Sequence, residues 1–324
     1  MTPIQVSIIV PVYNVAPYIE RCVKSVEAQE YTDGLECLLV DDCGQDSSIQ
    51  IATQLIEEYQ GPIIFRIVSH ETNRGLSAAR NTGIQAARGK YLYFLDADDS
   101  IHPDCISLMM SMVDKYPEVE MVQAGAYTQG TDPMPWLDMT NSRLSEYIQG
   151  IEKIKPIMLS RKSIPVTAWN RLIRKDFIIC HHLFFYEGLI HEDELWTFLL
   201  SKHLTSLAIL KKNVYLYEQR ASGIMAVSDM KKGQSLIQIA HEMIENIDQY
   251  CTRQTIAYIH RFIHLYSFDI YDEPQRLAFL DCSLQLTAKD YLFSRLIHLF
   301  WLYFAKKPIR RNRFLYSVLY HTIQ

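Results

Sequence analysis

The first 126 residues alternate between short apolar runs and amphipathic stretches of helical length. This alternation is typical of βαβ units, which build a mostly parallel sheet flanked by helices. The sequence therefore predicts an α/β fold with the following elements. The predicted strands are Val6–Val12, Glu36–Val40, Ile63–Val68, Tyr91–Leu95 and Glu120–Ala124, and the predicted helices are Ala16–Gln29, Asp46–Tyr59, Gly75–Arg88 and Pro103–Lys115.

The alternation stops after this segment, although the chain continues to residue 324. A polar insertion over residues 127–165 leads to a predicted helix near Ile148–Ser160, and a strand pair is predicted near Leu207–Leu210 and Val214–Glu218. From about Lys231 onward the pattern is helical. The expected organisation is a domain over residues 1–228, with parts at about 1–126 and 127–228, followed by a helical extension over 229–324.

Three carboxylates follow the apolar run Tyr91–Leu95, namely Asp96, Asp98 and Asp99. Two hard oxygen ligands at the Asp-x-Asp spacing can hold Mg²⁺ or Mn²⁺, and such an ion keeps positions for water and phosphate oxygens. A plainer alternative is that these acids only solvate a loop, or that Asp99 or Ser100 caps the following helix.

Polar residues also follow the first two predicted strands, in Pro11–Asn14 and Asp41–Asp46. The carboxyl ends of parallel strands meet at one edge of a sheet, where α/β folds bind their ligands. At least four carboxylates would crowd this edge, and such crowding is costly unless a cation offsets it. The glycine-rich loop of a dinucleotide site and the Walker loop are both missing from the sequence.

The cysteine pattern and the N-terminus favour a reducing compartment. The seven cysteines are odd in number and contain no Cys-x-x-Cys pair, which argues against a disulfide framework and against a zinc site. The chain runs from Met1 into a strand-like segment without a signal-like region. We therefore expect a cytoplasmic protein.

With these motifs assembled, the chain resembles the family 2 glycosyltransferases, which have the GT-A fold and include bacterial capsule and lipopolysaccharide sugar transferases. The resemblance covers roughly residues 5–225. The matching segments are Val6-Ser-Ile-Ile-Val-Pro-Val-Tyr-Asn14, Leu39-Val-Asp-Asp-Cys-Gly-Gln-Asp46, Asn73-Arg-Gly-Leu-Ser-Ala-Ala-Arg-Asn-Thr-Gly83, Leu95-Asp-Ala-Asp-Asp99 and His191-Glu-Asp-Glu194.

The resemblance implies a donor site in the first part of the domain. Asp42 would accept a hydrogen bond from the nucleotide base, most naturally from N3–H of uracil, because an ionised carboxylate is an acceptor only. Asp41 would be structural, and Arg80 would contact the ribose or the diphosphate, or else be a surface arginine of its helix. The implied lining of the base pocket is Pro11, Val12 and Tyr13.

For the metal, the resemblance implies that Asp98 is the principal ligand of Mg²⁺ or Mn²⁺ and that Asp96 contacts the ribose or the metal. Asp99 is then left to cap the helix that follows. The ion would offset the charge that develops on the departing nucleoside diphosphate.

For catalysis, the resemblance implies an inverting displacement with Asp193 as general base and Glu192 in support. The alternative is that these acids merely complement a helix dipole. His191 would orient the base, and Trp169 would face the acceptor sugar or be a core residue. Arg220 would lie close to the donor diphosphate.

The last 36 residues are basic, with seven Lys or Arg against one Asp, whereas the whole chain has a net charge of −5. Tyr291–Arg313 combines an aromatic, apolar stretch with a basic flank, which suits a helix lying on an anionic membrane. A helix packed on the domain is the alternative. The expected location is thus peripheral, on the inner face of the plasma membrane.

The expected function is metal-dependent transfer of a sugar from a nucleotide-sugar donor, a UDP-sugar, to a saccharide or a polyprenyl-linked saccharide in cell-surface polysaccharide synthesis. No nucleic acid partner is expected. The alternatives are a non-catalytic sugar-nucleotide-binding protein, disfavoured because Asp98 and Asp193 are present, and a nucleotidyltransferase, disfavoured because no basic glycine-rich loop is visible.

Overall fold

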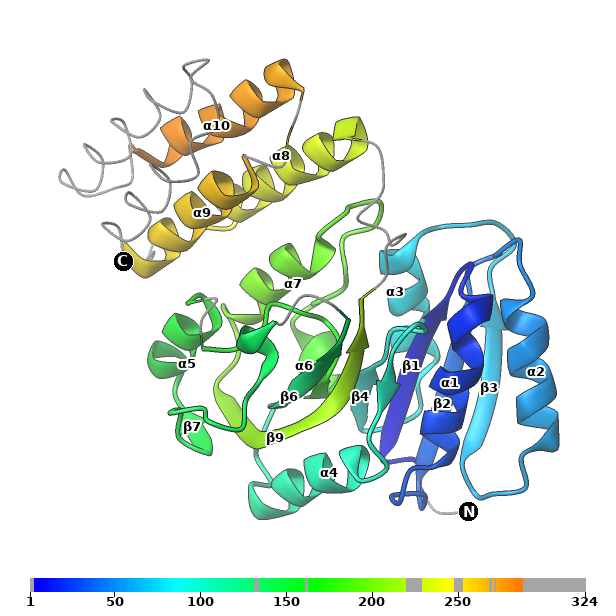
Figure 1. Ribbon diagram of the computed structural model, residues 1–324. Helices are drawn as coiled ribbons and strands as arrows, with labels where there is room; N and C mark the ends of the chain where they lie inside the picture. Colours follow the sequence, from blue (N-terminus) through cyan, green and yellow to red (C-terminus); the bar gives the residue numbers. More distant parts are fainter. Residues whose placement is uncertain are drawn as a thin grey trace. The chain divides into compact units, whose positions relative to one another are not determined.

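The apolar runs of the N-terminal region form parallel strands, as predicted (Figure 1). In the computed structural model of the chain, four of them lie in the order β3-β2-β1-β4. Val12 pairs with Asp41, so the carboxyl ends of β1 and β2 lie side by side. The strands are β1 (Val6–Val12), β2 (Leu35–Asp41), β3 (Ile64–Ser69) and β4 (Tyr91–Phe94).

The rest of the sheet is mixed, with short antiparallel ladders beside a long parallel pairing of β6 with β9. Antiparallel β8 joins β4 to β6, and β9 continues the sheet beside β6. The predicted strand pair at 207–218 is one long strand, β9, with a register shift opposite Gly125. These strands are β5 (Ser100–Ile101), β6 (Met121–Gln129), β7 (Tyr147–Gln149), β8 (Arg171–Arg174) and β9 (Ser206–Glu218).

Helices cover both faces of the sheet (Figure 1), and each face has its own apolar core. One core contains α1, α2 and α4 with Ile8 and Val10 of β1; the other contains α3, α5, α6 and α7 with Ile9. The first set is α1 (Ala16–Glu27), α2 (Ser48–Glu58) and α4 (Cys105–Lys115). The second is α3 (Leu76–Ala86), α5 (Ile151–Met158), α6 (Lys175–Cys180) and α7 (Glu192–Leu200), and a short 3-10 turn, η1 (Pro135–Leu137), lies between β6 and β7.

The close approach of α3 to β1 depends on Gly83. A Cβ atom at this position would lie 2.3 Å from Cγ2 of Ile9, a distance that no side chain tolerates. Glycine therefore lets α3 pack tightly on the sheet, and this packing fixes the position of Arg80 one turn earlier.

The structure describes residues 3–130, 134–160, 163–219, 229–247, 253–267, 270 and 272–287. By its contacts the chain divides into two compact units, Met1–Ala226 and Val227–Gln324. Described helices of the second unit pack around buried apolar side chains such as Phe262 and Phe279. They are α8 (Asp229–Glu245), α9 (Arg253–Tyr266) and α10 (Glu273–Thr287).

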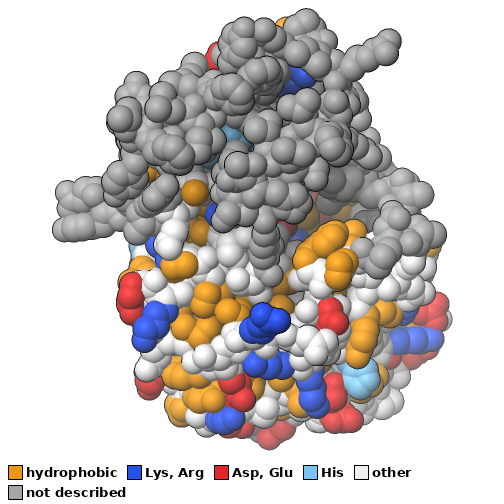
Figure 2. Space-filling view, turned by 60° about the vertical axis from the view of Figure 1, so that its left-hand side comes forward, with side chains coloured by type: hydrophobic (Ala, Val, Ile, Leu, Met, Phe, Trp, Pro, Cys, Tyr) orange, Lys and Arg blue, Asp and Glu red, His pale blue; other side chains and the backbone are white. Residues whose placement is uncertain are grey.

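On the face shown in Figure 2, acidic and basic side chains are interspersed with hydrophobic ones. The basic segment Tyr291–Arg313, predicted to contact a membrane, lies outside the described residues. No helix in the described ranges combines the length and apolar composition that a membrane span requires.

Candidate active site

Arg80 of α3 joins two of the predicted site acids. Its Nη2 donates to Oδ1 of Asp96 at 2.8 Å, and its Nη1 donates to Oε1 of Glu192 at 2.5 Å. The arginine is 2% exposed, and its guanidinium lies over the ring of Phe185. The carboxyl end of β4 and the start of α7 therefore meet at one buried cation.

Burial by itself would lower the pKa of Arg80, but the carboxylates of Asp96 and Glu192 outweigh this and raise it. The charge of Asp193 acts in the same direction, which places this residue within electrostatic reach of Arg80. The alternative of a surface arginine on an amphipathic helix is thus excluded for Arg80. In this structure its two terminal nitrogens are bound to protein carboxylates rather than facing an open site.

Asp99 does not cap the helix after it, so that prediction is wrong. Its Oδ2 accepts from the hydroxyl of Tyr215 at 2.6 Å, and its Oδ1 accepts from the backbone N–H of Glu218 at 2.8 Å. Asp99 thereby ties the acidic turn to β9, while α4 begins only at Cys105. Burial, together with the charges of Asp98 and Asp96, raises the pKa of Asp99 well above its usual value.

The acidic turn also rests on an aromatic stack. The Trp169 ring lies parallel to Tyr215, with centroids 4.4 Å apart, and the Tyr215 hydroxyl accepts from the backbone N–H of Asp96. Trp169 is only 8% exposed, which supports the core alternative over an open acceptor face.

A pocket opens at the carboxyl ends of β1 and β2. Val12, Tyr13 and Asp41 line it, and Tyr13 is 46% exposed. Asp41 accepts from the backbone N–H of Cys43 at 3.0 Å. Pro11 is buried within β1 opposite Val40 and is not part of the lining.

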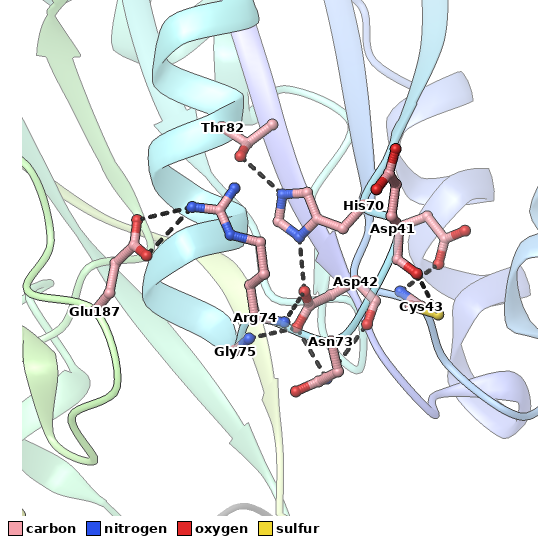
Figure 3. Close-up of polar contacts among 10 residues, drawn as sticks. Asp41, Asp42, Cys43, His70, Asn73, Arg74, Gly75, Thr82 and Glu187 are labelled. Atoms are coloured by element: carbon pink, nitrogen blue, oxygen red, sulfur yellow. Dashed lines mark hydrogen bonds and ion pairs between the residues drawn. The ribbon is translucent and has the colours of Figure 1, made fainter.

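Asp42 has a different role from the one predicted (Figure 3). Its carboxylate accepts four hydrogen bonds of 2.7 to 3.0 Å from the loop that follows β3. Because a carboxylate offers about four acceptor sites, these contacts leave none for a nucleotide base, and the predicted base contact needs correction. The four donors are Nδ1 of His70, Nδ2 of Asn73 and the backbone N–H groups of Arg74 and Gly75.

The first turn of α7 carries Glu192 and Asp193, the predicted catalytic pair. Glu192 is buried in its ion pair with Arg80, while Asp193 is partly exposed. His191 occupies the N-cap position with a left-handed backbone, φ 67°. The buried Arg171 of β8 donates to the Thr197 hydroxyl at 3.0 Å, which holds α7 against the sheet.

Sequence reasoning missed the side chains that attach α3 to the segment before α7. Asn81 donates to the carbonyl of Phe185 and accepts from its N–H, both at 2.8 Å, in a pattern that resembles strand pairing. Arg74 and Glu187 form an ion pair nearby (Figure 3). Asn81 directly follows Arg80 in the segment Asn73–Gly83, and this position beside a predicted site residue was the sequence signal that could have identified it. The predicted donor residue Arg220 lies outside the described residues.

The acidic turn has the donors that a divalent cation needs. Asp98 is partly exposed, and only one carboxylate oxygen of Asp96 is bound by Arg80. In the described part of the chain, no group of three or more potential ligands gathers at one point. An ion held by two carboxylates keeps positions for phosphate oxygens, so Asp96 and Asp98 fit Mg²⁺ or Mn²⁺ bound together with a nucleotide.

Comparisons with known proteins identify relatives of this chain. The uncharacterized glycosyltransferase YibD of Escherichia coli is 30% identical over 196 residues, which are 60% of this chain and 55% of that protein. The chain thus matches little more than half the length of this relative.

Two solved structures share the fold. S. aureus TarS (residues 1–349), in complex with UDP-GlcNAc, has a TM-score of 0.71 at 20% identity, covering 94% of this chain and 88% of that one. The mannosyltransferase PcManGT from Pyrobaculum calidifontis, in complex with GDP-Man and Mn²⁺, has a TM-score of 0.59 at 17% identity, covering 100% and 85%. The fold is therefore the GT-A type. Because the family pattern described as "Glycosyl transferase family 2" matches residues 7–181, more than half of the chain, the protein belongs to that family.

Proposed function

We propose that the chain transfers a sugar from a nucleoside diphosphate donor, a UDP-sugar, to a hydroxyl group of an acceptor, with inversion at the anomeric carbon. The observation that carries this proposal is the Arg80 bridge between Asp96 and Glu192. Through this bridge, the strand edge that suits a nucleotide and the helix start that carries the proposed general base belong to one site.

The donor base would lie against the exposed ring of Tyr13 in the pocket lined by Val12 and Asp41. Asp41 replaces Asp42 as the proposed acceptor for a base N–H, because the carboxylate of Asp42 is engaged by four protein donors. The complexes of TarS with UDP-GlcNAc and of PcManGT with GDP-Man support a nucleotide-sugar donor, and the first of them favours uracil.

In the proposed reaction, the acceptor oxygen forms a bond to the anomeric carbon as the bond from that carbon to the phosphate oxygen breaks. The nucleoside diphosphate leaves with the electron pair, and Asp193 takes the proton of the acceptor hydroxyl. Arg80 holds Glu192, the neighbour of Asp193, and so fixes the start of α7 relative to the donor edge.

Asp96 and Asp98 would hold Mg²⁺ or Mn²⁺. When bound, the ion supplies positive charge that stabilises the departing diphosphate. The Mn²⁺ in the PcManGT complex supports this choice of metal.

A donor screen with and without EDTA tests the function. We expect release of a nucleoside diphosphate from one donor, preferably a UDP-sugar, when a saccharide acceptor is present. EDTA should abolish this release, and added Mg²⁺ or Mn²⁺ should restore it. Asp98→Asn should raise the metal concentration needed for half-maximal rate about 10-fold or more, since a ligand is lost.

Two outcomes of this screen would contradict the proposal. Undiminished turnover after complete metal removal would remove the assigned role of Asp98. Tight binding of a sugar nucleotide without release of its nucleoside diphosphate would favour a non-catalytic protein. Glu146→Gln is a suitable control, because this exposed acid pairs with Lys115 at the end of α4.

We also propose an acceptor presented at a membrane, within cell-surface polysaccharide synthesis. The support is the apolar and basic sequence of Tyr291–Arg313. The full chain should sediment with anionic phosphatidylglycerol vesicles and not with neutral phosphatidylcholine vesicles. Replacing Arg310, Arg311 and Arg313 by Gln should reduce this binding, by about 1 kcal/mol per charge; equal binding to both vesicle types would contradict the proposal.

A further inference from the structure

Arg74, in the loop that follows β3, forms an exposed ion pair with Glu187 (Figure 3). Nη2 of Arg74 lies 3.3 Å from both carboxylate oxygens of Glu187, and the two side chains are 49% and 47% exposed. Ion pairs this exposed contribute little to stability. Another anion can therefore replace Glu187 at low cost.

The backbone of Arg74 is fixed although its side chain is exposed. Asp42 accepts from the N–H groups of Arg74 and Gly75, both at 2.8 Å. Asp42 also follows Asp41, which lines the pocket beside Tyr13. Arg74 is thus anchored at the edge of the sheet to which we assign the donor.

The glycines that follow the two members of the pair are not crowded by the described residues. Arg74 precedes Gly75 and Glu187 precedes Gly188, and a Cβ atom at either glycine would meet no described atom within 4 Å. Two guanidinium nitrogens of Arg74, Nε and Nη1, have no partner in the part of the chain that the structure describes. Because the Arg74 side chain is half-exposed, these nitrogens are donors available to a ligand.

Two arginines of the described chain that bind the acidic turn are committed to protein acceptors. Arg80 binds Asp96 and Glu192, as described above. Arg21 donates to Glu218 and to the carbonyl of Asp98, both at 2.7 Å. Diphosphate oxygens that the proposed metal does not bind are open to a second cationic partner, and the planar fork of an arginine suits such oxygens.

We propose that Arg74 binds the phosphate groups of the nucleotide donor, and that Glu187 holds its guanidinium until the donor displaces the carboxylate. This inference rests on the proposed function, because it assumes a nucleoside diphosphate at the same edge. It makes Glu187 a competitor of the donor. Removing the charge of Glu187 should therefore strengthen binding, whereas removing Arg74 should weaken it.

Calorimetric titration of the full chain with UDP and with uridine, at fixed Mg²⁺, tests this assignment. Arg74→Ala should weaken UDP binding about 10-fold or more, the usual effect of a lost charged hydrogen bond, and leave uridine affinity unchanged. Glu187→Gln should tighten UDP binding about two- to fivefold, the equivalent of a weak surface ion pair. In the Arg74→Ala background, Glu187→Gln should have no further effect.

Glu187→Gln is a mild change, since the amide oxygen can still accept from Asn81, whose Nδ2 lies 3.4 Å from Oε1 of Glu187. Glu146→Gln breaks an exposed ion pair elsewhere and should leave both affinities unchanged. If the Arg74–Glu187 pair only supports the local structure, both variants should lower the affinity for UDP and for uridine alike, and this result would overturn the inference. Unchanged UDP affinity in Arg74→Ala would overturn this inference and leave the proposed function standing. A wild-type chain that binds no nucleoside diphosphate would contradict both.

Discussion

Asp193→Asn is expected to lower kcat for sugar transfer by about 10²- to 10⁴-fold, the range that a general base contributes. Asparagine keeps the shape of the side chain but cannot take the proton of the acceptor hydroxyl. Asp193 lies in the first turn of α7 and is partly exposed, next to the buried Glu192. Because the donor is assigned to other residues, the KM for the donor and the affinity for UDP should stay within about twofold of wild type. The loss of one charged hydrogen bond to the donor would change them by much more.

The control for this experiment is Asp176→Asn. Asp176 is an exposed acid in the first turn of α6, so it has the same position relative to a helix dipole but lies outside the proposed site. If Asp193 only complements its helix dipole, both substitutions should cost about 0.3–1 kcal/mol of stability and leave kcat unchanged. Full activity in Asp193→Asn would place the base elsewhere.

Much of the fold could be predicted because its signals are local. The apolar runs of β1 to β4 and the Asp-x-Asp turn after β4 can be recognised within a few residues. Predicting β9 was harder, since the polar residues Lys211 and Lys212 look like a turn between two strands. They lie exposed where the register against β6 shifts at Gly125, so the strand continues through them.

The roles of individual acids were harder to predict because their partners are distant in sequence. Asp42 and Asp99 each follow a strand, so both looked available for a ligand or a cap. Asp42 is engaged by a loop about 30 residues later, and Asp99 by β9 more than 100 residues later. Only the folded structure brings these donors to the carboxylates. A strand-end motif therefore identifies the site more reliably than it assigns a role to each acid within it.

The second large effect is expected at Arg80. Arg80→Met should destabilise the protein by about 3–5 kcal/mol, the usual result of leaving one partner of a buried ion pair uncompensated. The partner left without a counter-charge is Glu192, whose side chain is 9% exposed, whereas the side chain of Asp96 is 24% exposed and better hydrated. Donor-dependent activity should also fall, because the start of α7 loses its link to the acidic turn.

Stability and catalysis can be separated by two further variants. Adding Glu192→Gln to Arg80→Met removes the uncompensated buried charge. The double variant should recover part of the lost stability without restoring kcat. Arg66→Met is a matched control, since Arg66 pairs at 3.1 Å with the buried Glu36 on the neighbouring strand, away from the site. It should lower the free energy of unfolding without changing kcat per folded molecule. Equal kcat in Arg80→Met and Arg66→Met, measured on folded protein, would show that Arg80 has a structural role only. A loss of kcat confined to Arg80→Met would identify Arg80 as the residue that fixes the proposed base relative to the donor.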